Sequence, residues 1–410
     1  MTTRSRKSRL TEPRGRTGLR RGGGAVLVVT AAVALWACAG GAKSPESSAE
    51  APGATANATE PVETAVSTSV RRFASNVNQA VGLAFDNRGR LLYAEKDSGR
   101  IVRVSGGKKR VLARLGVTGG AEAGLLGLAG DRRGNVYAYY TTGAAGCPNP
   151  TRSSGSGGDI DAHCVWSFSP SRGRLRAKKL VFSSNHPSSA RNHVGGGLHF
   201  GPDGALYLGL GDLGENSDPD RGPGRAQSLA VPFGKILRLN PNATNKGASG
   251  NPKTCGNAAN SSQRSISDGR IFACGLRNPY SFDWDSRKRL WAIDVGDSCD
   301  ELNIIRSGVN YGWEPPRTDC AGSGAGRVIK RINGTPSGVA ISKSRAAGSW
   351  RNDVFYCLFL SSELVRYDSR TRRATPVRSA RGKCGYDLIA RGNYIYMSDG
   401  NDIHRMRIRR

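Results

Sequence analysis

Short apolar runs separated by turns of Asp, Gly and charged residues recur from Val81 to the C-terminus. Each unit consists of an apolar strand, an Asp/Gly turn, a strand rich in Leu, Tyr or Trp, a second turn, and a strand that ends in Arg. The first unit spans residues 81–104, with its turn at Asp86–Gly89. The other units begin at or contain residues 126–142, 197–212 continued by 234–241, 280–296, 353–374 and 386–408. The pattern therefore predicts six repeats of one small β-unit.

The repeats recur at roughly 55 residues, with loop insertions expected at 143–165 and 212–233. Repeats of this size, built from short antiparallel strands, are typical of β-propeller blades. A β-sandwich or two stacked barrels would be the alternative, but neither needs the turn to recur inside every unit. We therefore predict an all-β, six-bladed propeller over residues 68–410. Loops at one end of its channel would bring distant residues to one site.

The N-terminus has the pattern of an export signal. A basic region, Arg4–Arg21, precedes an apolar run at 25–37 that is too short to span a bilayer comfortably. The run ends in Leu35-Trp36-Ala37-Cys38, which resembles a bacterial lipobox with an atypical Trp. We expect a signal peptide over 1–38, a lipid-anchored Cys38 at the outer face of the membrane, and a disordered linker over 39–67. Cleavage near residues 39–42, giving a secreted protein, is the alternative.

Composition agrees with the strand pattern, since the 410 residues include 55 glycines. The formal net charge is +29. Attraction to a polyanion such as nucleic acid, anionic lipid or an acidic cell-wall polymer would explain it. Basic residues scattered over solvated faces are the favoured explanation, because the chain has no RNA-binding signature, no helix-turn-helix pattern and no long basic helix. The tail supports this view: Arg405, Arg407 and Arg409 alternate with less polar residues, as on a strand with one wet face. We expect no nucleic-acid partner.

The cysteines point to disulfides. Eight of the nine follow Cys38, and they show neither a CxxC motif nor a Cys/His cluster. Sequence alone leaves their connectivity open. The most economical pairing joins neighbours, as Cys147–Cys164, Cys255–Cys274, Cys299–Cys320 and Cys357–Cys384. Each such bridge would contribute about 3 kcal/mol at best.

Three segments concentrate turn residues and polar side chains. They are Arg191–Asp212 (RNHVGGGLHFGPDGALYLGLGD), Gly275–Tyr280 (GLRNPY) and Gly296–Trp313 (GDSCDELNIIRSGVNYGW). We expect all three to meet at one site at an end of the channel.

These segments, together with EAGLLGLAGD at 122–131 and FGKILRLNP at 233–241, resemble the glucose/sorbosone dehydrogenase family over nearly all of residues 75–410. The resemblance implies a six-bladed propeller that oxidises a sugar by hydride transfer to pyrroloquinoline quinone (PQQ), with calcium at the quinone. The same superfamily includes propellers that have lost the cofactor and act as binding proteins.

The resemblance also implies residue roles. His193 would be the base that takes the hydroxyl proton, and Asp212 would orient it. Arg277 and Asn278 would lie beside the quinone, with Glu122 as a polar neighbour. Calcium would be bound at Gly296, through its backbone carbonyl, and at Asp297.

Each assignment has a structural alternative. His193 could cap a glycine turn, and Asp212 could be a turn former. The Arg277-Asn278-Pro279 segment could be a corner in which Asn bonds the backbone. Glu122 could face solvent.

The chain departs from the family at the cations that clamp the cofactor carboxylates. Leu360, Cys384 and Tyr386 stand where family enzymes have a lysine and two arginines. Lys383, Arg381 and Arg366 are the candidate substitutes. Loss of three cations would weaken binding of a tricarboxylate by several kcal/mol, at roughly 1.5–3 kcal/mol per charge-assisted bond.

Two acidic clusters interrupt the basic chain. One comprises Asp212, Glu215, Asp218 and Asp220, and the other Asp294, Asp297, Asp300 and Glu301. Clustered carboxylates with loop carbonyls suit calcium, but polar loops paired with arginines explain them equally well.

The sequence thus supports two functions. The first is an exported PQQ-dependent aldose dehydrogenase that acts on a sugar or oligosaccharide and passes electrons to an external acceptor. The second is a non-catalytic propeller that binds envelope carbohydrate or protein after loss of the clamp. A lactonase-type calcium hydrolase is a more distant third.

Overall fold

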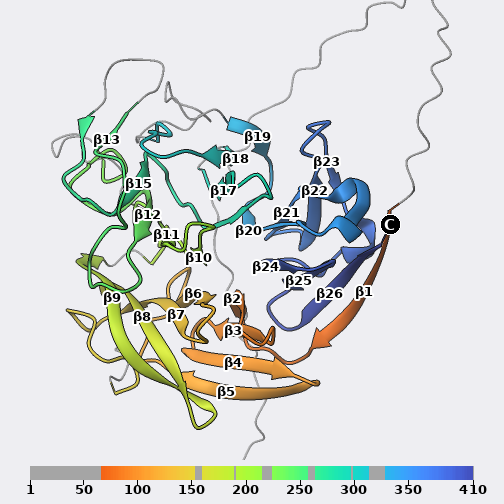
Figure 1. The fold of residues 1–410 in the computed structure, drawn as a ribbon, viewed down its shortest axis with the longest axis horizontal. Helices are drawn as coiled ribbons and strands as arrows, with labels where there is room; N and C mark the ends of the chain where they lie inside the picture. The colour runs from red at the N-terminus through yellow and green to blue at the C-terminus, as the bar shows by residue number, and fades with distance from the viewer. Residues whose placement is uncertain are drawn as a thin grey trace, which may run out of the picture. The chain divides into compact units, whose positions relative to one another are not determined.

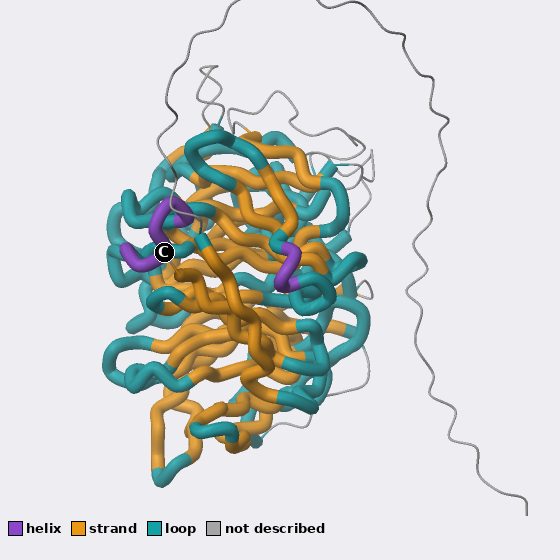
Figure 2. Tube along the Cα trace, turned by 90° about the vertical axis from the view of Figure 1, so that its right-hand side faces the viewer, coloured by secondary structure: helices purple, strands orange, loops and turns teal. Residues whose placement is uncertain are grey.

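The computed structural model describes residues 66–152, 159–188, 191–214, 224–256, 264–296, 299–313 and 328–409. Six four-stranded antiparallel sheets form the blades of a β-propeller, as Figure 1 shows. Strands account for nearly all of the regular structure of the described residues, in which only the short 3-10 turns η2 (Arg345–Trp350) and η3 (Arg378–Ala380) are helical (Figure 2). Within these ranges no helix is long and apolar enough to cross a membrane. The predicted fold class is confirmed.

The blades follow the chain in order, each from its innermost to its outermost strand. Blade 1 is β2 (Ala80–Phe85), β3 (Leu91–Glu95), β4 (Arg100–Ser105) and β5 (Lys108–Arg114). Blade 2 is β6 (Leu125–Gly130), β7 (Val136–Thr142), β8 (Ile160–Ser171) and β9 (Arg174–Ser188). Blade 3 is β10 (Leu198–Phe200), β11 (Leu206–Leu210), β12 (Lys235–Leu239) and β15 (Ile271–Cys274).

Blade 4 is β16 (Ser281–Trp284), β17 (Leu290–Asp294), β18 (Asp300–Ile305) and β19 (Val328–Ile332). Blade 5 is β20 (Pro336–Ile341), β21 (Val354–Leu358), β22 (Glu363–Tyr367) and β23 (Ala374–Pro376). Blade 6 is β24 (Leu388–Arg391), β25 (Tyr394–Ser398), β26 (Ile403–Arg409) and β1 (Ser67–Ala74). The β13 (Thr254–Cys255) and β14 (Arg264–Ser265) strands form a small ribbon beside blade 3.

The N-terminal strand closes the ring. β1 pairs with β26 from Ser67 opposite Arg409 to Ala74 opposite Ile403, so the outermost strand of the last blade comes from the start of the propeller. Each innermost strand contacts those of the two neighbouring blades, and β24 contacts β2. Closure leaves each blade packed on two others and removes the open sides that a linear stack would expose.

Burial follows from this packing. The second strands β3, β7, β11 and β17 are buried at every position because both faces of each sheet meet a neighbouring blade. The outermost β5 is mostly exposed. In β26, His404, Met406 and Ile408 are buried while the intervening arginines are partly or fully exposed, which confirms the alternation predicted for the tail.

An aspartate organises the recurring turn. Asp86 Oδ1 accepts hydrogen bonds from the amides of Arg88 and Arg90, and Asp285 Oδ1 does the same for Arg287 and Arg289. A turn of this kind needs a residue with positive φ, which Gly89 supplies at 73°. We call the end of the propeller that carries these turns the turn face and the opposite end the site face.

Several strands were missed from the sequence. Outermost strands such as β5, β19 and β23 lack a strong apolar pattern, and most of their residues are exposed or half-buried. The innermost strand of blade 5, β20, lies upstream of the predicted repeat. The insertion predicted at 143–165 is wrong at its end, since β8 begins at Ile160 and extends the sheet of blade 2.

Three of the predicted disulfides are confirmed: Cys147–Cys164, Cys255–Cys274 and Cys357–Cys384. The fourth predicted pair includes Cys320, which lies outside the described residues, as does Cys38. The Cys357–Cys384 bridge links β21 of blade 5 to the segment that leads into blade 6.

Replacing Cys357 and Cys384 with Ser is expected to lower the free energy of unfolding by about 2–4 kcal/mol, because the bridge restricts the unfolded chain. Denaturant titration of the double variant against the wild type measures the change. Equal midpoints and slopes for the two proteins would contradict this expectation.

Candidate functional site

His193 and Asp212 lie together at the site face because they flank one hairpin. His193 precedes β10, and Asp212 follows β11, which runs back antiparallel to it. The backbone at His193 is left-handed, with φ of 51°, and its carbonyl accepts from the Leu213 amide at 3.2 Å. A Cβ at Gly211 would lie 2.0 Å from that carbonyl. Glycine at 211 therefore allows the two ends of the hairpin to approach.

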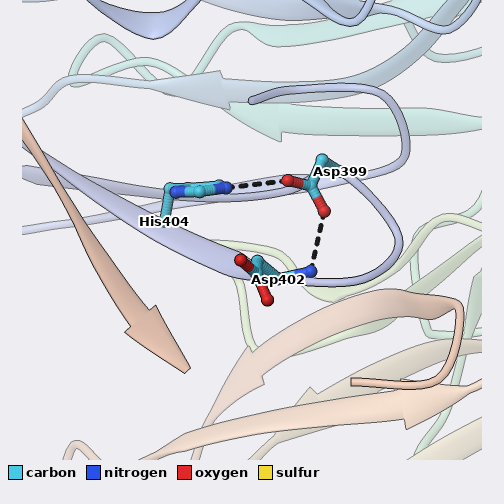
Figure 3. Close-up of side chains that lie close together, drawn as sticks. All are labelled: Asp399, Asp402 and His404. Atoms are coloured by element: carbon cyan, nitrogen blue, oxygen red, sulfur yellow. Dashed lines mark hydrogen bonds and ion pairs between the residues drawn. The ribbon is translucent and has the colours of Figure 1, made fainter. Parts of the chain in front are cut away.

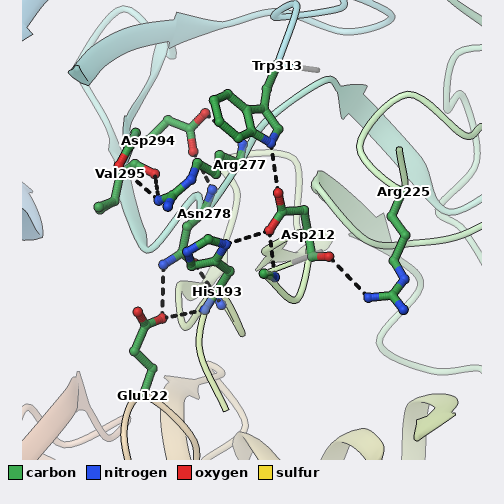
Figure 4. Close-up of polar contacts among 12 residues, drawn as sticks. Glu122, His193, Asp212, Arg225, Arg277, Asn278, Asp294, Val295 and Trp313 are labelled. Atoms are coloured by element: carbon green, nitrogen blue, oxygen red, sulfur yellow. Dashed lines mark hydrogen bonds and ion pairs between the residues drawn. The ribbon is translucent and has the colours of Figure 1, made fainter. Parts of the chain in front are cut away.

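The Asp212 carboxylate is buried and fully engaged (Figure 4). Its Oδ1 lies 2.7 Å from His193 Nδ1 and accepts the Gly214 amide at 2.9 Å. Its Oδ2 accepts Trp313 Nε1–H at 2.7 Å. A carboxylate only accepts, so His193 donates from Nδ1, and in the neutral ring Nε2 is then the acceptor. No group within the described ranges occupies Nε2.

Glu122 joins three blades at the site. Its Oε2 accepts the His193 amide at 2.8 Å and Asn278 Nδ2–H at 3.0 Å. Asn278 is buried, and its Oδ1 accepts the Gly195 amide at 3.0 Å. Glu122 precedes blade 2, and Asn278 precedes blade 4. His193 and Gly195, whose amides they bind, precede blade 3. Their contacts fix the His193 loop from both sides.

Arg277 lies beside this group against Trp313, with its guanidinium carbon 5.4 Å from the ring centroid. Its Nη1 donates to the carbonyls of Val295 and Gly296, both at 2.9 Å. The Gly296 oxygen, which the sequence assigned to calcium, therefore already has one donor, and a carbonyl has two lone pairs. Asp297, the other predicted calcium position, lies outside the described residues.

Asp294 supports the Arg277-Asn278 corner from beneath. Its two carboxylate oxygens accept the amides of Arg277 at 3.0 Å and Asn278 at 2.7 Å. Burial, and then the charge of Glu301, raise the pKa of Asp294 to about 8, although those two amide bonds oppose the shift. The corner is therefore held by a carboxyl group that costs energy to ionise.

Within the described residues, the acidic residues predicted as possible calcium ligands accept hydrogen bonds from backbone amides and from side chains of the protein. Asp300 accepts the amides of Gly296 at 3.1 Å and Thr335 at 2.8 Å, and burial raises its pKa. Glu301 accepts Asn303 Nδ2–H at 2.9 Å. Glu215, Asp218 and Asp220 lie outside those residues.

The structure brings the predicted residues within the described ranges to one place. The exposed fractions are 12% for the His193 side chain and 4% for that of Asp212. The carboxylate of Glu122 bonds the protein instead of facing only solvent. The Asn278 amide does serve as a structural corner, as the alternative held, and it also contacts Glu122.

Sequence reasoning gave no role to Trp313, although its NYGW motif was noted. A second unassigned residue is Lys235, which is completely buried in β12. Its Nζ donates to three carbonyls, those of Arg225 at 2.9 Å, Ala226 at 2.8 Å and Phe233 at 2.6 Å. Burial lowers its pKa to about 7. Lys235 thereby fastens the loop that reaches Asp212, since Arg225 Nη1 donates to the Asp212 carbonyl at 3.4 Å.

Blades 5 and 6 offer a different surface at the site face. Leu360 is 63% exposed and Phe359 40% exposed, in the loop between β21 and β22. Cys384 is held in a disulfide, and the Tyr386 ring lies edge-on to Phe359 with centroids 5.3 Å apart. The three positions that the family pattern reserves for cations are thus apolar or aromatic.

The candidate substitutes do not rebuild the clamp. Arg366 pairs with Asp353 and Asp368 at 2.7 Å each, at the turn face. Arg381 is largely exposed and lies 3.8 Å from Glu363, and Lys383 Nζ donates to the Ser379 carbonyl at 3.3 Å. The residues present on blades 2–4 thus suit the carbonyl end of a quinone and supply a proton acceptor. The residues present on blades 5 and 6 do not suit the carboxylates of the quinone.

A second His/Asp group lies on blade 6 (Figure 3). Asp399, Asp402 and His404 have ligand atoms within 4.8 Å of one another. His404 Nε2 lies 2.8 Å from Asp399 Oδ2, and Asp402 pairs with Arg72 of β1 at 2.7 Å. The Asp399 side chain also accepts the amides of Asn401 and Asp402. These contacts tie the β25–β26 turn and β1 together, which accounts for the group structurally.

Known proteins of similar sequence belong to a family that is consistent with the propeller fold. The family model described as Glucose / Sorbosone dehydrogenase matches residues 77–386. The chain is similar to the HIPL2 protein of Arabidopsis thaliana, at 36% identity over 154 residues that cover 34% of this chain and 21% of that protein. It is also similar to quinoprotein glucose dehydrogenase B of Acinetobacter calcoaceticus, at 27% identity over 259 residues that cover 58% of this chain and 51% of that protein. The chain therefore spans only about a fifth of the length of the first relative and about half of the length of the second.

Among solved structures, the PQQ-bound form of an aldose sugar dehydrogenase from Streptomyces coelicolor superposes with a TM-score of 0.65 and 26% identity. That match covers 84% of this chain and 98% of the other. The apo form of the soluble aldose sugar dehydrogenase from Escherichia coli gives a TM-score of 0.65 at 21% identity, which supports the fold.

The stability of the fold is expected to fall as pH rises, because Asp294 ionises. Its folded pKa of about 8 lies above the ordinary value of 3.8 for this side chain, so the folded state binds more protons than the unfolded state between about pH 4 and 8. Stability is therefore lost across that window. Asp294→Asn cannot ionise and is expected to lose less stability than the wild type as pH rises. Denaturant unfolding at several pH values measures both profiles, and parallel profiles would contradict the expectation.

Proposed function

Because the chain belongs to the glucose/sorbosone dehydrogenase family, we propose that it is a sugar dehydrogenase in which His193 takes the proton from a sugar hydroxyl. The observation that carries this proposal is the 2.7 Å contact between His193 Nδ1 and Asp212, with Asp212 itself held by Trp313. Similarity to a PQQ-bound aldose sugar dehydrogenase supports the same substrate class.

His193 is suited to accept a proton at Nε2. Asp212 fixes the tautomer, and it stabilises the imidazolium that forms once Nε2 has taken the hydroxyl proton. Glu122 holds the loop by its bond to the His193 amide, so the ring keeps its direction while its charge changes. A base that is oriented beforehand needs little reorganisation at the moment of reaction.

When bound, PQQ would supply the acceptor for the hydride. Arg277 and Asn278 would hold it at the blade 4 side, and the Gly296 carbonyl would face an accompanying calcium ion. With no clamp at Leu360, Cys384 and Tyr386, the quinone would be bound more weakly than a fully clamped tricarboxylate, by several kcal/mol at roughly 1.5–3 kcal/mol per missing bond. An external acceptor would then reoxidise it.

We further propose that the protein is exported to the bacterial cell envelope, anchored through Cys38 or secreted. The three disulfides support this placement, because such bridges persist mainly in oxidising compartments.

The apolar surface at Phe359 and Leu360 favours a second candidate function, a propeller that binds envelope carbohydrate or protein without catalysis. The two proposals differ in one property, since only the first requires the quinone to bind and turn over.

The first test is reconstitution with PQQ and Ca²⁺, followed by dye reduction with an aldose. Wild-type protein is expected to reduce the dye, and His193→Ala to lower kcat by about 10²–10⁴-fold, as expected for loss of a general base. His404→Ala is the matched control, because it removes a histidine from another His–Asp pair and is expected to keep wild-type activity. Equal activity of wild type and His193→Ala would contradict the proposed base, and no quinone binding at micromolar concentration would favour the second candidate.

A charge added at Leu360 is expected to improve quinone binding. Leu360→Lys places a cation where the carboxylates lack one, and one charge-assisted bond of about 1.5 kcal/mol corresponds to about tenfold tighter binding. Val111→Lys is the control, because Val111 is a 43% exposed apolar residue on the outermost strand of blade 1. Absorbance titration with PQQ gives both affinities. Equal affinities for the two variants would show that the quinone carboxylates do not lie toward blade 5.

A further inference from the structure

A cavity of about 840 Å³ opens between blades 2 and 3 at the turn face, at the opposite end of the strands from His193. The turn between β6 and β7 and the outermost strand β9 form one side. The turn between β10 and β11 and the segment after β12 form the other. Its lining includes four cations, Arg132, Arg133, Lys178 and Lys179, and two acids, Asp131 and Asp203.

The acids are already used by the protein. Asp131 accepts the Asn135 amide at 2.8 Å and Asn135 Nδ2–H at 2.6 Å. Asp203 accepts from Arg238 Nε at 2.8 Å and from the Tyr207 hydroxyl at 3.0 Å. Neither carboxylate contacts a cation of the cavity, so the positive charge of the lining is not neutralised from within.

Three of the cations have no side-chain partner in the described part of the chain. Arg132, Arg133 and Lys178 are exposed and make no ion pair or side-chain hydrogen bond there. Two of them follow each other in a turn fixed by Asp131, and the third lies on β9, on the same side of the cavity. Their charges therefore line the blade 2 side of the cavity from two elements, where an anionic group would meet more than one of them.

The wall facing these cations is rigid. Lys179 Nζ donates to the Asn242 carbonyl at 2.5 Å, and the Thr244 hydroxyl donates to the Leu180 carbonyl at 2.7 Å. The Ser183 amide donates to Asn245 Oδ1 at 2.8 Å. These bonds fasten the loop after β12 to β9, so the cavity is formed before any ligand arrives and binding need not order it.

The cavity also continues toward the centre of the turn face. A second hollow of about 360 Å³ shares Gly130 and the segment Phe200–Pro202 with it. Phe200, which lines both hollows, packs edge-to-face against Tyr137 of the first cavity, with centroids 5.0 Å apart. Among the described residues that line the second hollow, the one cation is Lys343, which is paired with Asp283 at 2.7 Å. Together the two hollows form an elongated site, and the three cations without a described side-chain partner lie at its outer end.

We propose that this cavity binds an acidic saccharide chain. Its carboxylate or sulfate groups would pair with Arg132, Arg133 and Lys178, and its hydroxyls would meet backbone carbonyls and the side chain of Asn242. A saccharide fits better than single-stranded nucleic acid, because the two aromatic rings of the lining pack against each other: Tyr137 is only 5% exposed, and the half-buried Phe200 lies edge-to-face on it. The proposal is independent of the redox site, which lies at the other face.

Isothermal titration of the full chain tests it, with an oligouronate, a sulfated oligosaccharide, a neutral oligosaccharide of the same length and a single-stranded oligonucleotide. The test variant carries Arg132→Gln, Arg133→Gln and Lys178→Gln. The control variant carries Arg372→Gln, Arg373→Gln and Arg378→Gln, which removes the same charge from exposed arginines of blade 5.

An acidic saccharide is expected to bind the wild type, the control variant and His193→Ala alike, and to bind the test variant at least about tenfold more weakly, as loss of one charge-assisted bond or more requires. The oligouronate and the sulfated arm together identify which anionic group is preferred. Equal weakening in both triple variants would show a general response to net charge and overturn the proposal. Equally tight binding of the neutral saccharide, tighter binding of the oligonucleotide, or no binding by either acidic saccharide would also overturn it.

Discussion

The buried carboxylate of Asp212 is the contact on which the site depends. It accepts hydrogen bonds from the His193 ring, the Gly214 amide and the Trp313 indole, so one side chain joins the two ends of a hairpin in blade 3 to the loop that follows blade 4. Removing any one of these donors would leave part of a buried carboxylate unsatisfied, at a cost of about 1–3 kcal/mol or more. The direction of His193 is therefore built into the packing between blades.

Much of the fold was predictable because its inner strands repeat a pattern that packing enforces. Second strands such as β7 and β17 are apolar on both faces, and an Asp-led turn recurs beside them. The outer strands β5, β19 and β23 carry weaker patterns, and β20 lies upstream of the predicted fifth repeat. The closing strand β1 was not recognised, since its only sheet partner lies at the other end of the chain.

The site was predictable only where motifs carry its residues. His193, Asp212 and Asn278 stand in segments dense in turn residues, and the structure brings them together. The contributions of Trp313 and Lys235 depend on tertiary contacts, because neither a lone indole donor nor a lysine in an apolar strand has a local pattern. Lys235 was unexpected for a physical reason: three backbone carbonyls replace the counter-ion that a buried ammonium group normally needs.

The two faces of the propeller differ in how charge is distributed. At the site face, polar groups are densely bonded on blades 2–4, and the facing surface of blades 5 and 6 is apolar at Phe359 and Leu360. At the turn face, three cations without a side-chain partner among the described residues line the blade 2 side of a cavity between blades 2 and 3. At the site face, proton transfer requires that His193 presents an unprotonated Nε2. Long-range ¹H–¹⁵N NMR of protein labelled at histidine identifies the tautomer. The Nδ1–H tautomer is expected for His193 in the wild type and is expected to be lost in Asp212→Asn, whereas a proton on Nε2 in the wild type would show that His193 cannot act as the base.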